Sequence, residues 1–151
     1  MVSEKDESAK ALERIMLEKI TTHKTNIVLL LKSGQALPDE MVLPLIEIGE
    51  QSKLILARLV SSPEVFKQGD RFLSRYLERA QAIVSQAIEV GKSPDSASFS
   101  AALERARNAL QSLSAAFRLE YQRLLEGDAQ NLNIESGLVE RLLKMEGYKS
   151  E

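Results

Sequence analysis

The chain has 151 residues, a formal net charge of -2 and no cysteine. This length supports one domain with its own core, and 44% hydrophobic with 28% charged residues exclude wholesale disorder. The absence of cysteine excludes disulfides, thiolate nucleophiles and cysteine-ligated metal sites, and the small net charge provides no general field for recruiting nucleic acid.

Apolar residues recur with a 3.6-residue period, which predicts five helices and no strand. The first helix is expected over about 4–32, with Ser3 or Ser8 as a cap at its start and Gly34 at its end. One stripe of this helix carries most of its apolar side chains and the single histidine: Leu12, Ile15, Met16, Ile20, His23, Ile27, Leu30 and Leu31.

The second helix is expected over about 38–61, because Pro38 followed by two acids suits a first helical turn. Pro44 leaves two alternatives: the main helix begins near Leu43, or the chain kinks at the proline. Two stripes are apolar, which predicts a central position in a bundle: Leu45, Ile48, Ile55 and Leu59, and also Ile46, Leu56 and Val60. Gly49 and Ser52 are small enough to allow a neighbouring helix to come close.

Three further helices are expected over about 70–90, 96–126 and 132–146, each followed by a glycine. Short connections between long helices favour antiparallel neighbours. The predicted fold is therefore all-α, an antiparallel bundle of four long helices plus a short C-terminal helix. We expect one domain over 1–151, with 1–8 and 148–151 frayed.

Hydropathy favours a soluble, cytoplasmic protein. The longest aliphatic run, from Ile27 to Leu31, is too short to span a bilayer, so no integral membrane segment is expected. The polar, acidic N-terminus has no apolar stretch like that of a signal peptide.

Few residues have the chemistry of a catalytic or metal site. His23 is the only histidine, which excludes a multi-histidine metal site and favours a hydrogen-bonded residue at the edge of the apolar stripe. Paired acids at Glu47 and Glu50, and at Glu126 and Asp128, are conceivable magnesium ligands, but such pairs are usually solvated surface. We predict no catalytic residue, metal site or cofactor.

The strongest polar pattern is basic. Arg71, Arg75 and Arg79 stand at i, i+4 and i+8, so they form one stripe on the third helix. Two interpretations remain open. The stripe is either a solvated face paired with Asp70, Glu78 and acids of neighbouring helices, or a contact site for an acidic partner or an anionic ligand.

The second half of the chain, from about Leu43 to Tyr148, resembles the bacterial XpaC-like family, named for bromo-chloro-indolyl phosphate hydrolysis. The similar residues are Ser62 to Val65, Phe72 to Leu77, Ala116-Phe117 with Tyr121 to Leu124, Asp128 to Glu135, and Leu142 to Tyr148. Asn131 and Asn133 stand where acids are commoner in the family, which argues against a metal-binding turn.

The resemblance implies a link to toxic-anion (tellurite) resistance, because family members are associated with helical resistance proteins of the TelA type. Our leading hypothesis is a non-enzymatic helical protein acting through protein–protein contacts, with a TelA-type partner or a second copy of the chain. The alternative is a metal-dependent phosphoester hydrolase, as the family name suggests. A third hypothesis is peripheral binding to a membrane surface.

Overall fold

The structure is a computed structural model that describes residues 4–93 and 98–132. It contains four α-helices: α1 (Glu4–Ser33), α2 (Asp39–Ser61), α3 (Phe66–Gly91) and α4 (Phe99–Leu132). Two short 3-10 turns, η1 (Gly34–Ala36) and η2 (Pro63–Val65), follow α1 and α2. No strand occurs in the described residues, and the prediction of an all-helical fold is confirmed. The short helix predicted over 132–146 lies outside the described residues, apart from Leu132.

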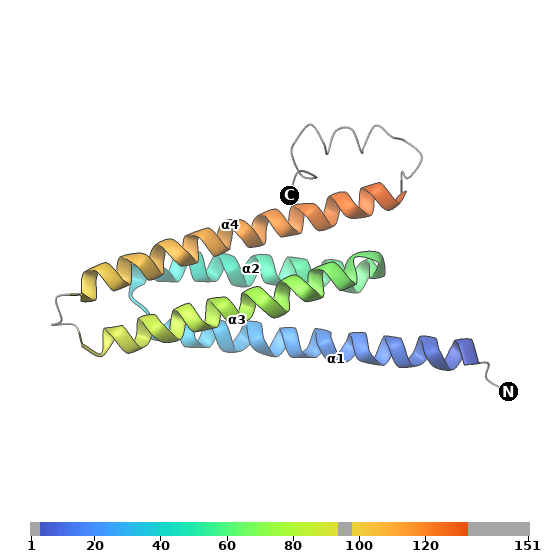
Figure 1. Ribbon diagram of the computed structural model, residues 1–151, viewed down its shortest axis with the longest axis horizontal. Helices are drawn as coiled ribbons and strands as arrows, with labels where there is room; N and C mark the ends of the chain where they lie inside the picture. The colour runs from blue at the N-terminus through green and yellow to red at the C-terminus, as the bar shows by residue number, and fades with distance from the viewer. Residues whose placement is uncertain (1–3, 94–97, 133–151) are drawn as a thin grey trace.

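The four helices lie side by side along the long axis of the molecule, and consecutive helices run in opposite directions (Figure 1). Helix α2 packs against each of the other three, most extensively against α4. The N-terminal end of α1 projects past the adjoining ends of α2 and α3 (Figure 1). In the described part of the chain, no helix combines the length and apolarity needed to cross a membrane.

Helix α2 starts at Asp39 and includes Pro44, so the alternative in which the helix begins near Leu43 is wrong. Its first turn is closed by a 3.0 Å hydrogen bond from the Met41 amide to the Pro38 carbonyl. A proline inside a helix removes one backbone donor. Pro44 is the sixth residue of α2, so only one backbone hydrogen bond near the helix start is lost. The amides of the first turn also have no acceptor within the helix.

Two predicted boundaries are wrong. Helix α3 begins at Phe66 rather than at residue 70, because η2 leads directly into it after the break at Ser62. Helix α4 does not stop at Gly127 but continues to Leu132. A glycine inside a helix costs about 1 kcal/mol, which neighbouring turns readily offset. A Cβ on Gly127 would lie 3.5 Å from a methyl of Val65, so the helix passes close to η2 there.

The core is a single cluster of apolar side chains contributed by all four helices. Its largest fully buried members are Phe117, Ile27, Leu30, Met41, Leu45, Ile48, Ile55, Leu59, Leu73, Leu110, Leu124 and Val84.

Part of the predicted apolar stripes is exposed. Leu12 and Ile15 are 59% and 49% exposed, because this part of α1 extends beyond its neighbours. On α2, Ile46 and Val60 are 44% and 60% exposed, whereas Leu56 is buried. The apolar stripes predicted on α1 and α2 are therefore only partly buried.

Two glycines allow close helix contacts. A Cβ on Gly49 would lie 2.8 Å from a methyl of Leu31, which agrees with the close approach predicted there. A Cβ on Gly69 would lie 2.3 Å from a methyl of Leu59, a side chain that is 1% exposed. A side chain at position 69 would therefore require the buried Leu59 to shift, so α3 lies close against α2 there.

We predict that Gly69→Ala destabilises the protein by about 1–3 kcal/mol, because the added methyl forces the buried Leu59 to shift. Gly91→Ala is the matched control, since nothing lies within 4 Å of its Cβ position. It should be neutral or stabilise by up to about 1 kcal/mol. Urea unfolding of both variants measures the difference, and equal stabilities would contradict this close contact.

Candidate functional site

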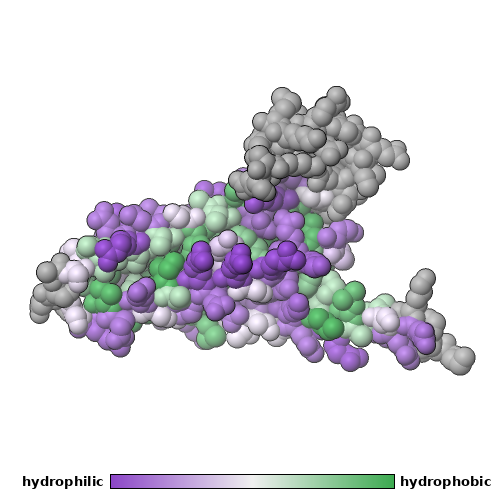
Figure 2. Space-filling model, viewed as in Figure 1, coloured by the Kyte–Doolittle hydropathy of each residue, from purple (hydrophilic) through white to green (hydrophobic). Residues whose placement is uncertain are grey.

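The most prominent polar feature is a row of cations on α3. Lys67, Arg71, Arg75 and Arg79 stand on consecutive turns and are all exposed; we call these four residues the basic ridge. Figure 2 shows a row of strongly hydrophilic side chains along α3. The sequence predicted only the three arginines. Lys67 was missed because the helix start was placed at residue 70, although its spacing of four before Arg71 was the available signal.

The ridge lacks ion pairs within the described part of the bundle. Among the described residues, none forms an ion pair with any of its four cations. The described structure shows no ion pair between the arginine stripe and Asp70 or Glu78, and the exposure of its side chains fits both a solvated face and a contact site. The Arg79 guanidinium carbon lies 5.7 Å from the centre of the Tyr76 ring, a cation–π contact that holds this side chain against α3.

Asp70, which directly precedes Arg71, is bound by α1 instead. Its two carboxylate oxygens accept hydrogen bonds from His23 Nε2 at 2.7 Å and from Lys19 Nζ at 3.1 Å. Burial alone raises the pKa of the Asp70 carboxyl, but the hydrogen bonds and charges of His23 and Lys19 outweigh it and lower this pKa below its ordinary value. Asp70 is therefore ionised at neutral pH and ties α3 to α1.

His23 is more buried than an edge residue. It is 3% exposed, and its Nε2 carries the hydrogen bond that the sequence analysis expected. Its Nδ1 is also buried and has no partner in the described structure. Within residues 4–93 and 98–132, no group of three or more histidine, aspartate or glutamate side chains is placed to hold a metal ion.

The two predicted acid pairs differ in their surroundings. Glu47 forms an ion pair with Arg118 of α4, and Glu50 is exposed. Glu126 lies on α4 and is half-buried, while the side chain of Asp128 lies outside the described part of the structure.

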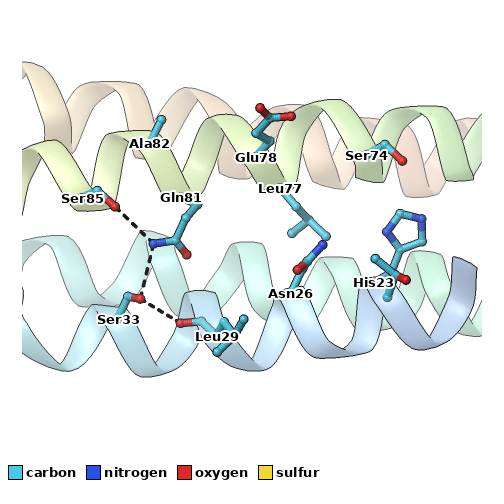
Figure 3. Close-up of a pocket in the computed structure, with 11 residues that line it drawn as sticks. His23, Asn26, Leu29, Ser33, Ser74, Leu77, Glu78, Gln81, Ala82 and Ser85 are labelled. Carbon is cyan, nitrogen blue, oxygen red and sulfur yellow. Dashed lines mark hydrogen bonds between the residues drawn. The ribbon is translucent and has the colours of Figure 1, made fainter.

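A groove of about 750 Å³ lies between α1 and α3 (Figure 3). Its surface is mostly apolar, with Leu29, Leu77 and Ala82 among its lining residues. Hydroxyl and amide side chains lie along it, and Glu78 is its one carboxylate. Gln81 joins the two helices there, since its Nε2 donates to Ser33 Oγ at 3.4 Å and to Ser85 Oγ at 3.3 Å. His23 closes one part of the groove. These groups suit hydrogen bonding to a neutral polar molecule better than to an anion.

Glu120 is a buried acid that the sequence analysis missed. It is 6% exposed on α4 and accepts a 3.1 Å hydrogen bond from Gln68 Nε2 of α3. Burial raises the pKa of Glu120 above its ordinary value, although the Gln68 hydrogen bond and the charge of Arg123 act in the opposite direction. Its position between Phe117 and Leu124 on the apolar face was the signal that could have revealed it.

The family model described as 5-bromo-4-chloroindolyl phosphate hydrolysis protein matches residues 9–138. The chain belongs to this family. The resemblance seen in the sequence is thus confirmed, and the match begins earlier than predicted because it includes most of α1. No curated protein and no solved structure matches the chain.

We predict that Asp70→Asn destabilises the protein at neutral pH by about 1–2 kcal/mol, because the charge-assisted bonds to His23 and Lys19 are weakened. A carboxyl with a lowered pKa stabilises the fold above its unfolded pKa of about 3.9, and this contribution disappears as the pH falls through the folded-state pKa. Urea unfolding at pH 7 and in steps down to about pH 2 measures the effect. The exposed Glu50→Gln is the control, and a difference that persists at the lower pH would contradict the assignment.

For Glu120 the pH dependence of stability is the reverse of that for Asp70. A carboxyl with a raised pKa favours folding below its unfolded value, and this advantage is lost as the pH rises through the folded-state pKa. Glu120→Gln keeps a partner for Gln68 without a buried charge, so we predict a higher Tm at pH 7, by roughly 2–4 °C for each kcal/mol recovered. Thermal unfolding should show little difference at about pH 4. A lower Tm at pH 7 would show that the ionised form is favoured.

Proposed function

We propose that this protein is a non-enzymatic helical scaffold that binds a protein partner with an acidic surface through the basic ridge. The observation that carries the proposal is the set of four exposed cations on one helix, with no ion pair to any described residue. The guanidinium and ammonium groups of this surface are hydrogen-bond donors. The carboxylates of a partner can accept hydrogen bonds from them.

The spacing suits an extended acidic partner. A step of four residues rises about 6 Å along a helix, so the ridge extends over roughly 18 Å. Arginine presents a planar fork of donors that matches a carboxylate with two parallel hydrogen bonds. Exposed pairs of this kind contribute little individually, but together they raise the association rate and determine which partner is preferred.

The structure of α3 supports a fixed presentation of these cations. The opposite face of the helix is anchored by Leu73, Leu77 and Ala80, all of which are buried. Asp70 is the acid nearest to Arg71 in sequence, and both of its oxygens are already bound by α1. Asp70 is therefore bound to α1 and does not compete with a partner for the cations of the ridge.

For the partner, the XpaC-like resemblance favours a toxic-anion (tellurite) resistance protein of the TelA type. Under this proposal the two proteins meet in the cytoplasm, and the family's phosphate-hydrolysis phenotype arises indirectly.

Intrinsic phosphoester hydrolysis is the second candidate, and the name of the family favours it. It requires carboxylates that hold a divalent metal and arginines that clamp the phosphate. The ridge could supply the arginines. The described residues contain no carboxylate cluster next to it, since Asp70 faces α1 and Glu120 faces Gln68.

We predict that Arg71→Glu/Arg75→Glu weakens binding of a TelA-type protein from the same genome at least tenfold, measured by biolayer interferometry at two salt concentrations. Arg14→Glu/Arg105→Glu is the matched control, because it removes two exposed arginines and changes the net charge equally. Wild-type affinity should fall with added salt.

Equal weakening by both double variants would contradict a role for the ridge, because it would reflect the overall charge alone. Unchanged affinity in the Arg71→Glu/Arg75→Glu variant would contradict it as well.

A further inference from the structure

The groove between α1 and α3 runs along both helices (Figure 3). Its α1 wall extends from Thr22 to Ser33, and its α3 wall extends from Ser74 to Ser85. Each wall is about 18 Å long, since a helix rises about 1.5 Å per residue. The groove is therefore long enough to hold about three turns of a further helix.

The basic ridge borders this groove on the α3 side. Each arginine of the ridge stands three residues before a residue that lines the groove: Arg71 before Ser74, Arg75 before Glu78 and Arg79 before Ala82. Residues three positions apart are neighbours on a helix surface. A segment that lies in the groove along α3 is therefore beside the cations of the ridge.

The groove itself suits apolar contacts. Most of its surface is apolar, and Leu29 on its α1 wall is 52% exposed. Figure 3 shows Asn26 of α1 and Leu77 of α3 pointing toward one another across the groove. Small side chains such as Ser74 and Ser85 on the α3 wall leave room for another helix to come close. Charged groups of a bound segment are better placed over the ridge than inside the groove.

We propose that the groove receives an amphipathic helix of the partner, with its apolar face between α1 and α3 and its acids over the basic ridge. This inference rests on the proposed function and adds the form of the docking segment. Acids four residues apart on such a helix are separated by about 6 Å along its axis, the same step as the cations of the ridge. One helix can therefore use the groove and the ridge together.

Backbone hydrogen bonding favours a helix over an extended peptide. Alternate residues of an extended peptide are also separated by about 7 Å, so the spacing of the ridge fits both forms. An extended peptide leaves its own amides and carbonyls open, and it gains most from a free sheet edge. No strand occurs in residues 4–93 and 98–132. A helix satisfies its own backbone groups and can therefore lie in an apolar groove.

Glu78 predicts a further feature of the docking helix. It is exposed, and it stands between Arg75 and Arg79 in the sequence as the one carboxylate that lines the groove. An acid of the partner beside Glu78 would be repelled, whereas a lysine or arginine would be attracted. We therefore expect a basic residue among the acids of the docking helix.

The first test uses the TelA-type protein of the ridge experiment as the probe and Asn26→Trp as the groove variant. Asn26 is exposed on the α1 wall, so a partner that binds the ridge alone would not contact it. Asn108→Trp is the matched control, because Asn108 is exposed on α4 and does not line the groove. In biolayer interferometry we expect Asn26→Trp to weaken binding at least tenfold and Asn108→Trp to bind like the wild type. Circular dichroism should show equal helix content in all three proteins.

Site-specific crosslinking then identifies the docking segment. The chain has no cysteine, so Asn26→Cys and Asn108→Cys each introduce a single thiol for a photoreactive benzophenone label. We expect the label at position 26 to react with one segment of the probe, in which apolar residues recur every three or four positions beside acids four apart. The label at position 108 should not react with that segment.

The outcomes separate this inference from the proposed function. Binding that depends on the ridge but is unchanged in Asn26→Trp would overturn the docking of a helix in the groove and leave the proposed function intact. Crosslinks from position 26 that form only within the chain or to a second copy would overturn it as well, because the groove would then have another occupant. A wild type that does not bind the probe at all would contradict the proposed function and, with it, this inference.

Discussion

The packing of α2 against the other three helices is the interaction on which the rest of the structure depends. Ile48 and Ile55 of α2 are completely buried, and Leu59 lies so close to α3 that a Cβ at Gly69 would force it to shift. Gly49 provides a similar contact toward α1 through Leu31. Since α1 and α3 are both held by α2, their polar side chains are fixed relative to each other. The pairing of Asp70 with His23 and Lys19 is one consequence, and the groove between α1 and α3 is another.

Asp70 separates two chemically different surfaces. On the α1 side its carboxylate forms a part-buried polar cluster with His23 and Lys19. Because both of its oxygens are used there, they are not available to the neighbouring arginines. On the outer side of α3, the basic ridge is presented on a helix whose other face is buried. The cations are thus available for an anionic surface, and helix packing keeps them in register.

The sequence was sufficient to predict the four described helices and most of the core, because amphipathic period and glycine or proline breaks are local signals. It failed where local signals were weak. The start of α3 was misplaced because η2 adds a turn before Phe66, and this hid Lys67. Gly127 predicted a helix end, but α4 continues through this glycine to Leu132. Gly127 lies close to Val65 of η2.

The candidate site depends on contacts between residues distant in sequence, which no periodic pattern reveals. His23 and Asp70 are 47 positions apart, and Gln68 and Glu120 are 52 apart. The exposure of Leu12 and Ile15 follows from how far α1 extends past its neighbours, a property of helix lengths in space.

The central claim is that this family member acts by binding rather than by its own catalysis. The most direct measurement is hydrolysis of 5-bromo-4-chloroindolyl phosphate by the purified full chain, with magnesium, manganese or zinc added in turn. We predict no turnover above that of an identically purified Arg71→Glu/Arg75→Glu/His23→Ala variant. Turnover that co-migrates with the wild-type protein, scales with its concentration and is abolished in that variant would contradict the claim.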